Sequence, residues 1–177
     1  LIPFMALHGG LFIGNFSSLV GDSAPEDAGM TFLGGAVLGG ITPYLVTRKS
    51  GISKGRAAWL SATTTWGAIL PPATMLGLKV ENEKALQGAL LGGQVVGLGV
   101  GLLTMDRIDY TSGDMLFINM SGFAGMLTAG SILVTTKLED RLKEASALVV
   151  ETGFIAGALA AALKTTSLQF SSGDAMA

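Results

Sequence analysis

The sequence has no cysteine and few charged residues for its length. Of its 177 residues, 14% are Asp, Glu, Lys or Arg, whereas soluble domains carry about 25%. A soluble domain of this size needs polar side chains to cover its surface, and this chain has too few. The lack of cysteine excludes disulfide frameworks, thiolate metal sites and cysteine nucleophiles. The net charge of −2 offers no basic surface for nucleic acid, so no nucleic-acid partner is expected.

The charged residues divide the chain into long uncharged runs. The runs comprise residues 1–21, 28–47, 57–78, 85–105, 115–136 and, interrupted only by Glu151, 145–163. Each is about 20 residues long, which lets a helix cross a hydrocarbon core about 30 Å thick. Strands of an outer-membrane barrel would alternate in polarity over about 10 residues, and these runs do not. Because the links are short, we predict an all-α polytopic membrane protein with about six transmembrane helices in antiparallel hairpins.

A two-helix pattern recurs along the chain. A shift of 58 positions (86 − 28) aligns residues 28–84 with residues 86–142 without a gap and yields ten identities. The identities are Leu33 with Leu91, Gly34 with Gly92, Gly35 with Gly93, Val37 with Val95, Gly39 with Gly97, Leu45 with Leu103, Gly55 with Gly113, Gly67 with Gly125, Lys79 with Lys137, and Glu81 with Glu139. Chance similarity between apolar segments does not explain matches that extend through the loops.

The alignment predicts how the chain is organised. The predicted units are residues 1–27 (second half of a unit), 28–84, 85–142 and 143–177 (first half of a further unit). We expect residues 1–177 to form a single transmembrane region that is a fragment of a longer repeat protein.

Glycine is abundant and lies inside the apolar runs. The 26 glycines are roughly twice the number that an average usage of about 7% supplies. Glycines spaced by four residues line one face of a helix with backbone and let a partner helix approach closely. A phosphate-binding loop would instead place its glycines between a strand and a helix. We predict glycine-zipper packing by Gly35, Gly39, Gly88, Gly92, Gly93, Gly97, Gly101, Gly125, Gly153 and Gly157.

Hydroxyl residues mark three predicted helix starts. The segments Ser53-Lys54-Gly55, Thr111-Ser112-Gly113-Asp114 and Ser171-Ser172-Gly173-Asp174 each precede an apolar run. A side-chain oxygen at such a position accepts hydrogen bonds from the free N–H groups of the first turn. A hydroxyl residue in each segment is therefore predicted to be an N-cap and not a nucleophile.

Few polar side chains fall inside the runs. Thr64, Gln94, Asn119 and Glu151 are candidates for a polar pathway, because polar groups within a membrane often line transport routes. The alternative is that they hydrogen-bond between helices and serve packing. His8 is the only histidine and leaves one base of that type, and we predict no Ser/His/Asp set around it. No catalytic, cofactor-binding or metal site is predicted, and no cofactor is expected.

These observations favour a function without catalysis. We predict an integral membrane scaffold or a pore-forming subunit of a larger assembly, in contact with lipids and with other membrane subunits or further copies of itself. The main alternative is a transporter or channel, which requires the four polar side chains to converge on a wet cavity. A tightly packed soluble helical array is a third alternative. We expect a bacterial integral membrane protein, and the sequence does not identify which membrane holds it.

Overall fold

The computed structural model describes residues 2–20, 32–37, 51–136 and 145–165. These residues are helical or in links and include no strand, which confirms the predicted all-α class. The helices are α1 (Ile2–Val20), α3 (Lys54–Gly77), α4 (Glu83–Thr104), the 3-10 helix η1 (Met105–Arg107), α5 (Ser112–Thr135) and α7 (Ser146–Thr165). Residues 32–37 form a short helical segment.

Three helices begin at a side chain that caps the first turn. Ser53 Oγ accepts a hydrogen bond of 3.2 Å from the backbone N–H three residues later, and Asn82 Oδ1 accepts one of 3.0 Å in the same way. At α5, Thr111 Oγ1 accepts from the Asp114 N–H at 3.0 Å, while the Asp114 carboxylate accepts from the Thr111 N–H at 2.7 Å. This reciprocal pair is a capping box. The caps predicted in residues 53–55 and 111–114 are confirmed as Ser53 and Thr111, and residues 171–174 lie outside the described residues.

The link between α3 and α4 turns the chain back on itself. Lys79 has a positive φ of 60°, a conformation usually taken by glycine after a helix. The Lys79 N–H donates to the Leu76 carbonyl, and the Val80 N–H donates to the Met75 carbonyl, each at 2.9 Å. These bonds satisfy the last carbonyl groups of α3, so that α3 and α4 become antiparallel neighbours.

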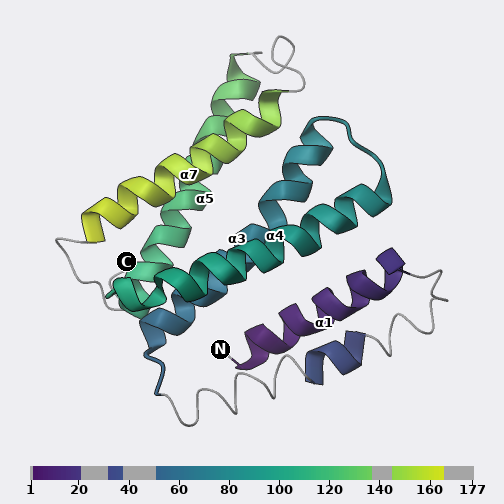
Figure 1. The fold of residues 1–177 in the computed structure, drawn as a ribbon. Helices are drawn as coiled ribbons and strands as arrows, with labels where there is room; N and C mark the ends of the chain where they lie inside the picture. The colour runs from purple at the N-terminus through teal and green to yellow at the C-terminus, as the bar shows by residue number, and fades with distance from the viewer. Residues whose placement is uncertain (1, 21–31, 38–50, 137–144, 166–177) are drawn as a thin grey trace.

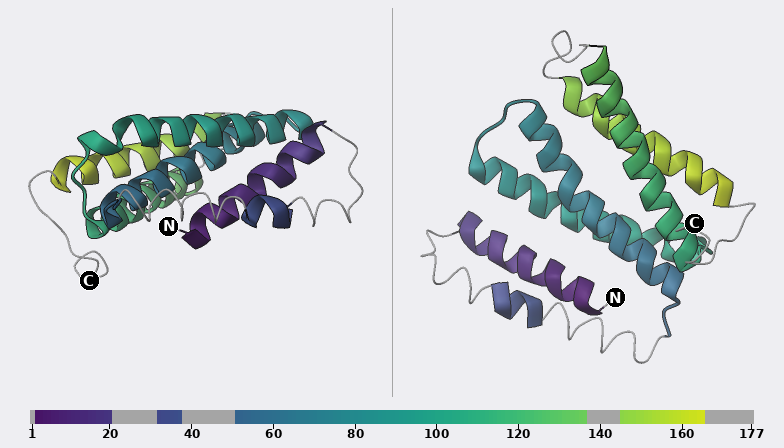
Figure 2. Two further views of the ribbon diagram at one scale, coloured as in Figure 1. Left: turned by 60° about the horizontal axis from the view of Figure 1, so that its bottom comes forward. Right: turned by 180° about the vertical axis from the view of Figure 1, so that it is seen from behind.

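The helices form three pairs that lie side by side (Figures 1 and 2). One pair is α3 with α4, and another is α5 with α7. In the third, α1 lies beside residues 32–37. The α3/α4 pair lies between the other two, and α3 is the central element because it contacts α1, α4, α5 and α7.

Three of the described helical stretches are long and apolar enough to cross a membrane. They are Glu83–Arg107, Ser112–Thr135 and Ser146–Thr165. Protein covers little of them, since at most 22% of the residues in their apolar windows are buried. Large apolar side chains are exposed, including Leu103 at 80% and Leu127 at 66%, as expected of surfaces that face lipid or a partner. The helices α1 and α3 are not among the three, and only residues 32–37 of the run 28–47 are described.

Candidate functional site

The helices α3 and α4 cross with backbone against backbone. A Cβ atom added to Gly93 would overlap the carbonyl oxygen of Gly67, and one added to Gly67 would overlap that of Gly93. Gly97 faces the carbonyl oxygen of Thr63 in the same way. A Cβ added to Gly101, one turn further along α4, would instead overlap the side-chain hydroxyl of Thr63. A side chain at Gly67, Gly93 or Gly97 would therefore push the two helices apart.

Pro71 contributes to this crossing. The helix α3 continues through Pro71 and Pro72, but a proline has no N–H to donate to the carbonyl four residues earlier. For Pro71 that carbonyl belongs to Gly67, whose oxygen lies against Gly93. The oxygen is thus available to the Cα–H of Gly93, a weak but stabilising contact.

The pair α5/α7 crosses in the same manner. A Cβ on Gly125 would overlap the carbonyl oxygen of Gly153, and one on Gly153 would lie 2.6 Å from that of Gly125. Gly157 faces the carbonyl oxygen of Ser121. The contacts are again between backbones, so neither helix can make room by rotating a side chain.

The pair formed by α1 and residues 32–37 crosses at aligned positions. A Cβ on Gly35 would overlap the carbonyl oxygen of Gly9. The crossing glycines on the first helices of successive pairs are 58 residues apart. Those on the second helices are 58 residues apart between the first and second pairs, and 60 between the second and third. The aligned positions are Gly9, Gly67 and Gly125 on the first helices, and Gly35, Gly93 and Gly153 on the second.

Two of the predicted packing glycines, Gly88 and Gly92, lie on another face of α4. An added Cβ at either would meet no atom within 4 Å. Each residue of a helix turns about 100°, so these two glycines point away from the face that carries Gly93 and Gly97. The predicted set of packing glycines on α4 therefore combined residues from two different sides of the helix. Gly39 lies outside the described residues.

His8, Thr65 and Gln94 form a polar cluster between α1, α3 and α4, in which His8 and Gln94 are buried. Gln94 Nε2 lies 3.0 Å from His8 Nδ1 and 3.1 Å from the His8 carbonyl oxygen. His8 Nε2 lies 3.2 Å from Thr65 Oγ1, and the Thr65 hydroxyl donates to the Ser61 carbonyl at 2.9 Å. Because the Gln94 amide nitrogen is a donor, His8 Nδ1 accepts and Nε2 carries the hydrogen donated to Thr65. Gln94 Oε1 has no hydrogen-bond partner among the described residues.

Trp66, Phe123 and Phe154 form an aromatic cluster between α3, α5 and α7. The Trp66 ring centroid lies 5.0 Å from that of Phe123 and 3.9 Å from that of Phe154. The Trp66 indole N–H donates to Asn119 Oδ1 at 2.9 Å. This hydrogen bond satisfies the only polar atom of the indole.

The polar and aromatic clusters occupy aligned positions. The aligned residues are His8 with Trp66 and Thr65 with Phe123, each at a shift of 58, and Gln94 with Phe154 at a shift of 60. The polar cluster joins the first helix pair to the second, and the aromatic cluster joins the second to the third. The same positions therefore meet through hydrogen bonds in one place and through aromatic rings in the other.

A further polar contact joins α3 to α7. The Thr74 hydroxyl lies 2.6 Å from Glu151 Oε2 and 2.8 Å from Oε1. Nearby, a Cβ on Gly77 would overlap the side chain of Ala147. The carboxylate thus accepts a hydrogen bond at a close contact between the two helices.

The four residues predicted to line a polar pathway have separate partners. Gln94 bonds to α1, whereas Asn119 and Glu151 each bond to α3. Thr64 donates to the carbonyl oxygen of Leu60, in its own helix, at 2.7 Å. Gln94, Asn119 and Glu151 thus connect different helices, Thr64 does not, and none of the four lines the hollow described next.

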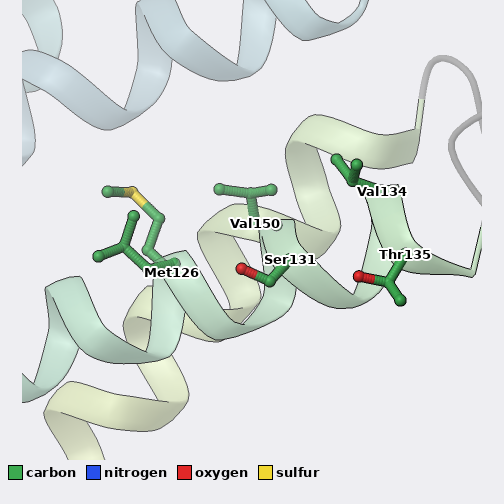
Figure 3. A pocket seen from close by; sticks show the side chains of 7 residues that line it. Met126, Ser131, Val134, Thr135 and Val150 are labelled. Carbon is green, nitrogen blue, oxygen red and sulfur yellow. The ribbon is translucent and has the colours of Figure 1, made fainter.

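An open hollow of about 520 Å³ lies beside α5 (Figure 3). It is lined by side chains of α5 between Met126 and Thr135 and by Val150 of α7. The lining is mainly apolar, with hydroxyl groups from Ser131 and Thr135. A Cβ on Gly130 would lie 3.9 Å from the Val150 side chain, so α5 and α7 are in looser contact here than at their glycine crossing.

Trp66 and Thr74, the partners of Asn119 and Glu151, were not predicted from the sequence. A tryptophan inside an apolar run has an N–H group that needs an acceptor, and this signal was available for Trp66. No sequence feature distinguishes Thr74 from the other threonines of the chain.

No group of three or more acidic or histidine side chains within the described ranges is arranged to hold a metal ion. At one end of the molecule, Arg56 Nη1 pairs with Asp106 Oδ1 at 3.0 Å, and both side chains are solvent-exposed.

No protein family, curated protein or solved structure matches this chain.

Proposed function

We propose that the chain is a non-catalytic membrane scaffold, a subunit of a larger assembly built from stacked and repeated helical hairpins. The observation that carries this proposal is the glycine crossing, which occurs at aligned positions in all three helix pairs. Helices in lipid gain no hydrophobic energy by associating, so they depend on close backbone packing and hydrogen bonds. A repeated glycine zipper supplies the close backbone packing.

The proposal includes about six membrane crossings. The helix α3 packs along α4 and is joined to it by the short link 78–82, so a bilayer that α4 crosses is crossed by α3 as well. The hydroxyls of Thr63, Thr64 and Thr65 donate to carbonyls of the preceding turn, which makes them compatible with lipid. The 19 residues of α1 extend about 28 Å at 1.5 Å per residue, close to the hydrocarbon thickness.

The polar side chains support packing more than transport. Gln94, Asn119 and Glu151 each bridge two helices, and hydrogen bonds between membrane helices contribute about 0.6–2 kcal/mol. A transport pathway would need several of these groups to face one water-filled space. Their separate pairings instead distribute the polar contacts between neighbouring helix pairs, where a scaffold needs them.

The test combines membrane association with permeability. The full chain is reconstituted in lipid vesicles, extracted with alkaline carbonate, and assayed for ion flux against empty vesicles. A scaffold stays in the membrane and leaves the vesicles as tight as the empty ones. Release into the supernatant would contradict a membrane location. An ion flux that Glu151→Gln or Asn119→Leu reduces would replace the scaffold with a channel.

A further inference from the structure

We infer that α5 presents a docking face for a second copy of the chain, whose α1 and residues 32–37 stack on it head to tail. The inference rests on the proposed function, because it extends the stacking of helix pairs beyond one chain. It depends on three features: the aligned contact positions inside the chain, the exposed residues at those positions on the outer pairs, and the hollow beside α5.

Inside the chain, one residue on the first helix of a pair contacts both helices of the next pair, and we call its place the leading position. This position is His8 in the polar cluster and Trp66 in the aromatic cluster. The shift of 58 places Ala124 at the leading position of α5. Ala124 is exposed, so this third leading position has space for a partner.

The first helix pair carries the position that would contact Ala124 of another copy. Thr65 and Phe123 are the residues on the following pair that face the leading position, and Leu7 is aligned with both. Leu7 is 51% exposed. The stacking that joins successive pairs within the chain would therefore place Leu7 of a second copy against Ala124.

The positions aligned with Thr74 and Glu151 support the same contact between copies. The contact between Thr74 and Glu151 joins two helix pairs, and its aligned positions are Ile132 on α5 and Leu33 in the segment 32–37. Ile132 is 53% exposed and Leu33 is 60% exposed. An apolar side chain thus stands at both positions where the internal contact has a hydroxyl and a carboxylate.

The occupant is a second copy because the two outer faces are complementary. Both predicted contacts, Ala124 with Leu7 and Ile132 with Leu33, match apolar with apolar. The hollow of Figure 3 lies beside an overlapping stretch of α5, from Met126 to Thr135, but neither Ala124 nor Ile132 is one of its lining residues. The two faces differ from each other, so the contact is heterologous and can continue from copy to copy.

Cysteine cross-linking tests the inference against a clean background, since the chain has no cysteine. The variants Leu7→Cys and Ala124→Cys carry different tags and are reconstituted together in vesicles, then oxidised or treated with a short bis-maleimide. The expected product is a dimer that carries both tags. Its yield should fall when excess untagged, cysteine-free chain competes for the face. Ile132→Cys with Leu33→Cys should behave alike.

The matched control replaces Leu7→Cys with Leu103→Cys, which is 80% exposed but lies on α4. A yield for Leu7 with Ala124 no higher than for this control would overturn the inference. Dominant dimers of Ala124→Cys with itself would also overturn it, because they indicate a symmetric face. The double variant Thr74→Cys/Glu151→Cys reports stacking within one chain. If it cross-links while the intermolecular pair does not, the second copy is refuted and the scaffold proposal stands.

Discussion

Replacing Gly97 by alanine tests the backbone crossing of α3 and α4. A Cβ at Gly97 would overlap the Thr63 carbonyl oxygen and would lie 3.1 Å from the Cα of Gly67. These are backbone atoms, so the clash can be relieved only by separating α3 from α4. Gly99, two residues further along α4, has no atom within 4 Å of an added Cβ. Gly99→Ala is therefore the matched control.

The two substitutions should change stability in opposite directions. Overpacking of this kind costs about 1–3 kcal/mol, while replacing glycine by alanine inside a helix gains about 0.5–1 kcal/mol. Gly97→Ala should therefore lower the free energy of unfolding by roughly 0.5–2 kcal/mol. Gly99→Ala has only the gain and should raise it by about 0.5–1 kcal/mol.

The measurement is unfolding by SDS in mixed micelles, followed by tryptophan fluorescence. Both tryptophans, Trp59 and Trp66, belong to α3, so the signal reports on the helix that the substitution displaces. The reasoning is refuted if Gly97→Ala is as stable as Gly99→Ala. Gly157→Ala extends the test to α7, where it should be destabilising because Gly157 faces the Ser121 carbonyl.

Three further predictions use the same unfolding assay. Lys79→Gly should raise stability by about 0.5–1 kcal/mol by relieving the positive φ, while Lys79→Ala, which keeps the strain, should not; equal effects would contradict this account. Thr111→Val removes the hydroxyl that caps Asp114 N–H and should cost about 1 kcal/mol; an unchanged midpoint would mean that the cap is not needed. A double-mutant cycle of Trp66→Phe with Asn119→Leu should give a coupling of about 0.6 kcal/mol for their hydrogen bond; zero coupling would indicate that the two side chains do not interact.

The helices and their starts could be predicted from the sequence because both depend on local chemistry. Uncharged runs of membrane length predict helices, since a backbone in lipid must satisfy its own polar groups. The helices α3 and α5 begin three residues before the uncharged runs, at Lys54 and Ser112. The caps at Ser53 and Thr111 explain the difference, because they start a helix where its first turn still reaches charged residues.

The contacts between helices were less predictable because they depend on which face meets which partner. Glycine spacing identified Gly93 and Gly97 but also included Gly88, which lies on another side of α4. The partner of Glu151 is Thr74, 77 residues earlier in the chain, and nothing local connects them. Only a three-dimensional arrangement of the helix pairs brings such residues together.

The difference between the polar and aromatic clusters has a consequence for the order of the stack. If the helix pairs are repeats, a pair could in principle dock at the wrong place, and the glycine crossings would not prevent it. The side chains at the leading positions would prevent it. His8 placed against the rings of Phe123 and Phe154 would lose its side-chain hydrogen-bond partners, and Trp66 placed at Gln94 would offer the buried amide no acceptor in place of His8 Nδ1. An unpaired buried polar group costs about 1–3 kcal/mol, enough to discriminate between neighbours that share one backbone geometry. Glycine therefore sets how closely the two helices of a pair approach, and the residues at the leading positions set which pair follows which.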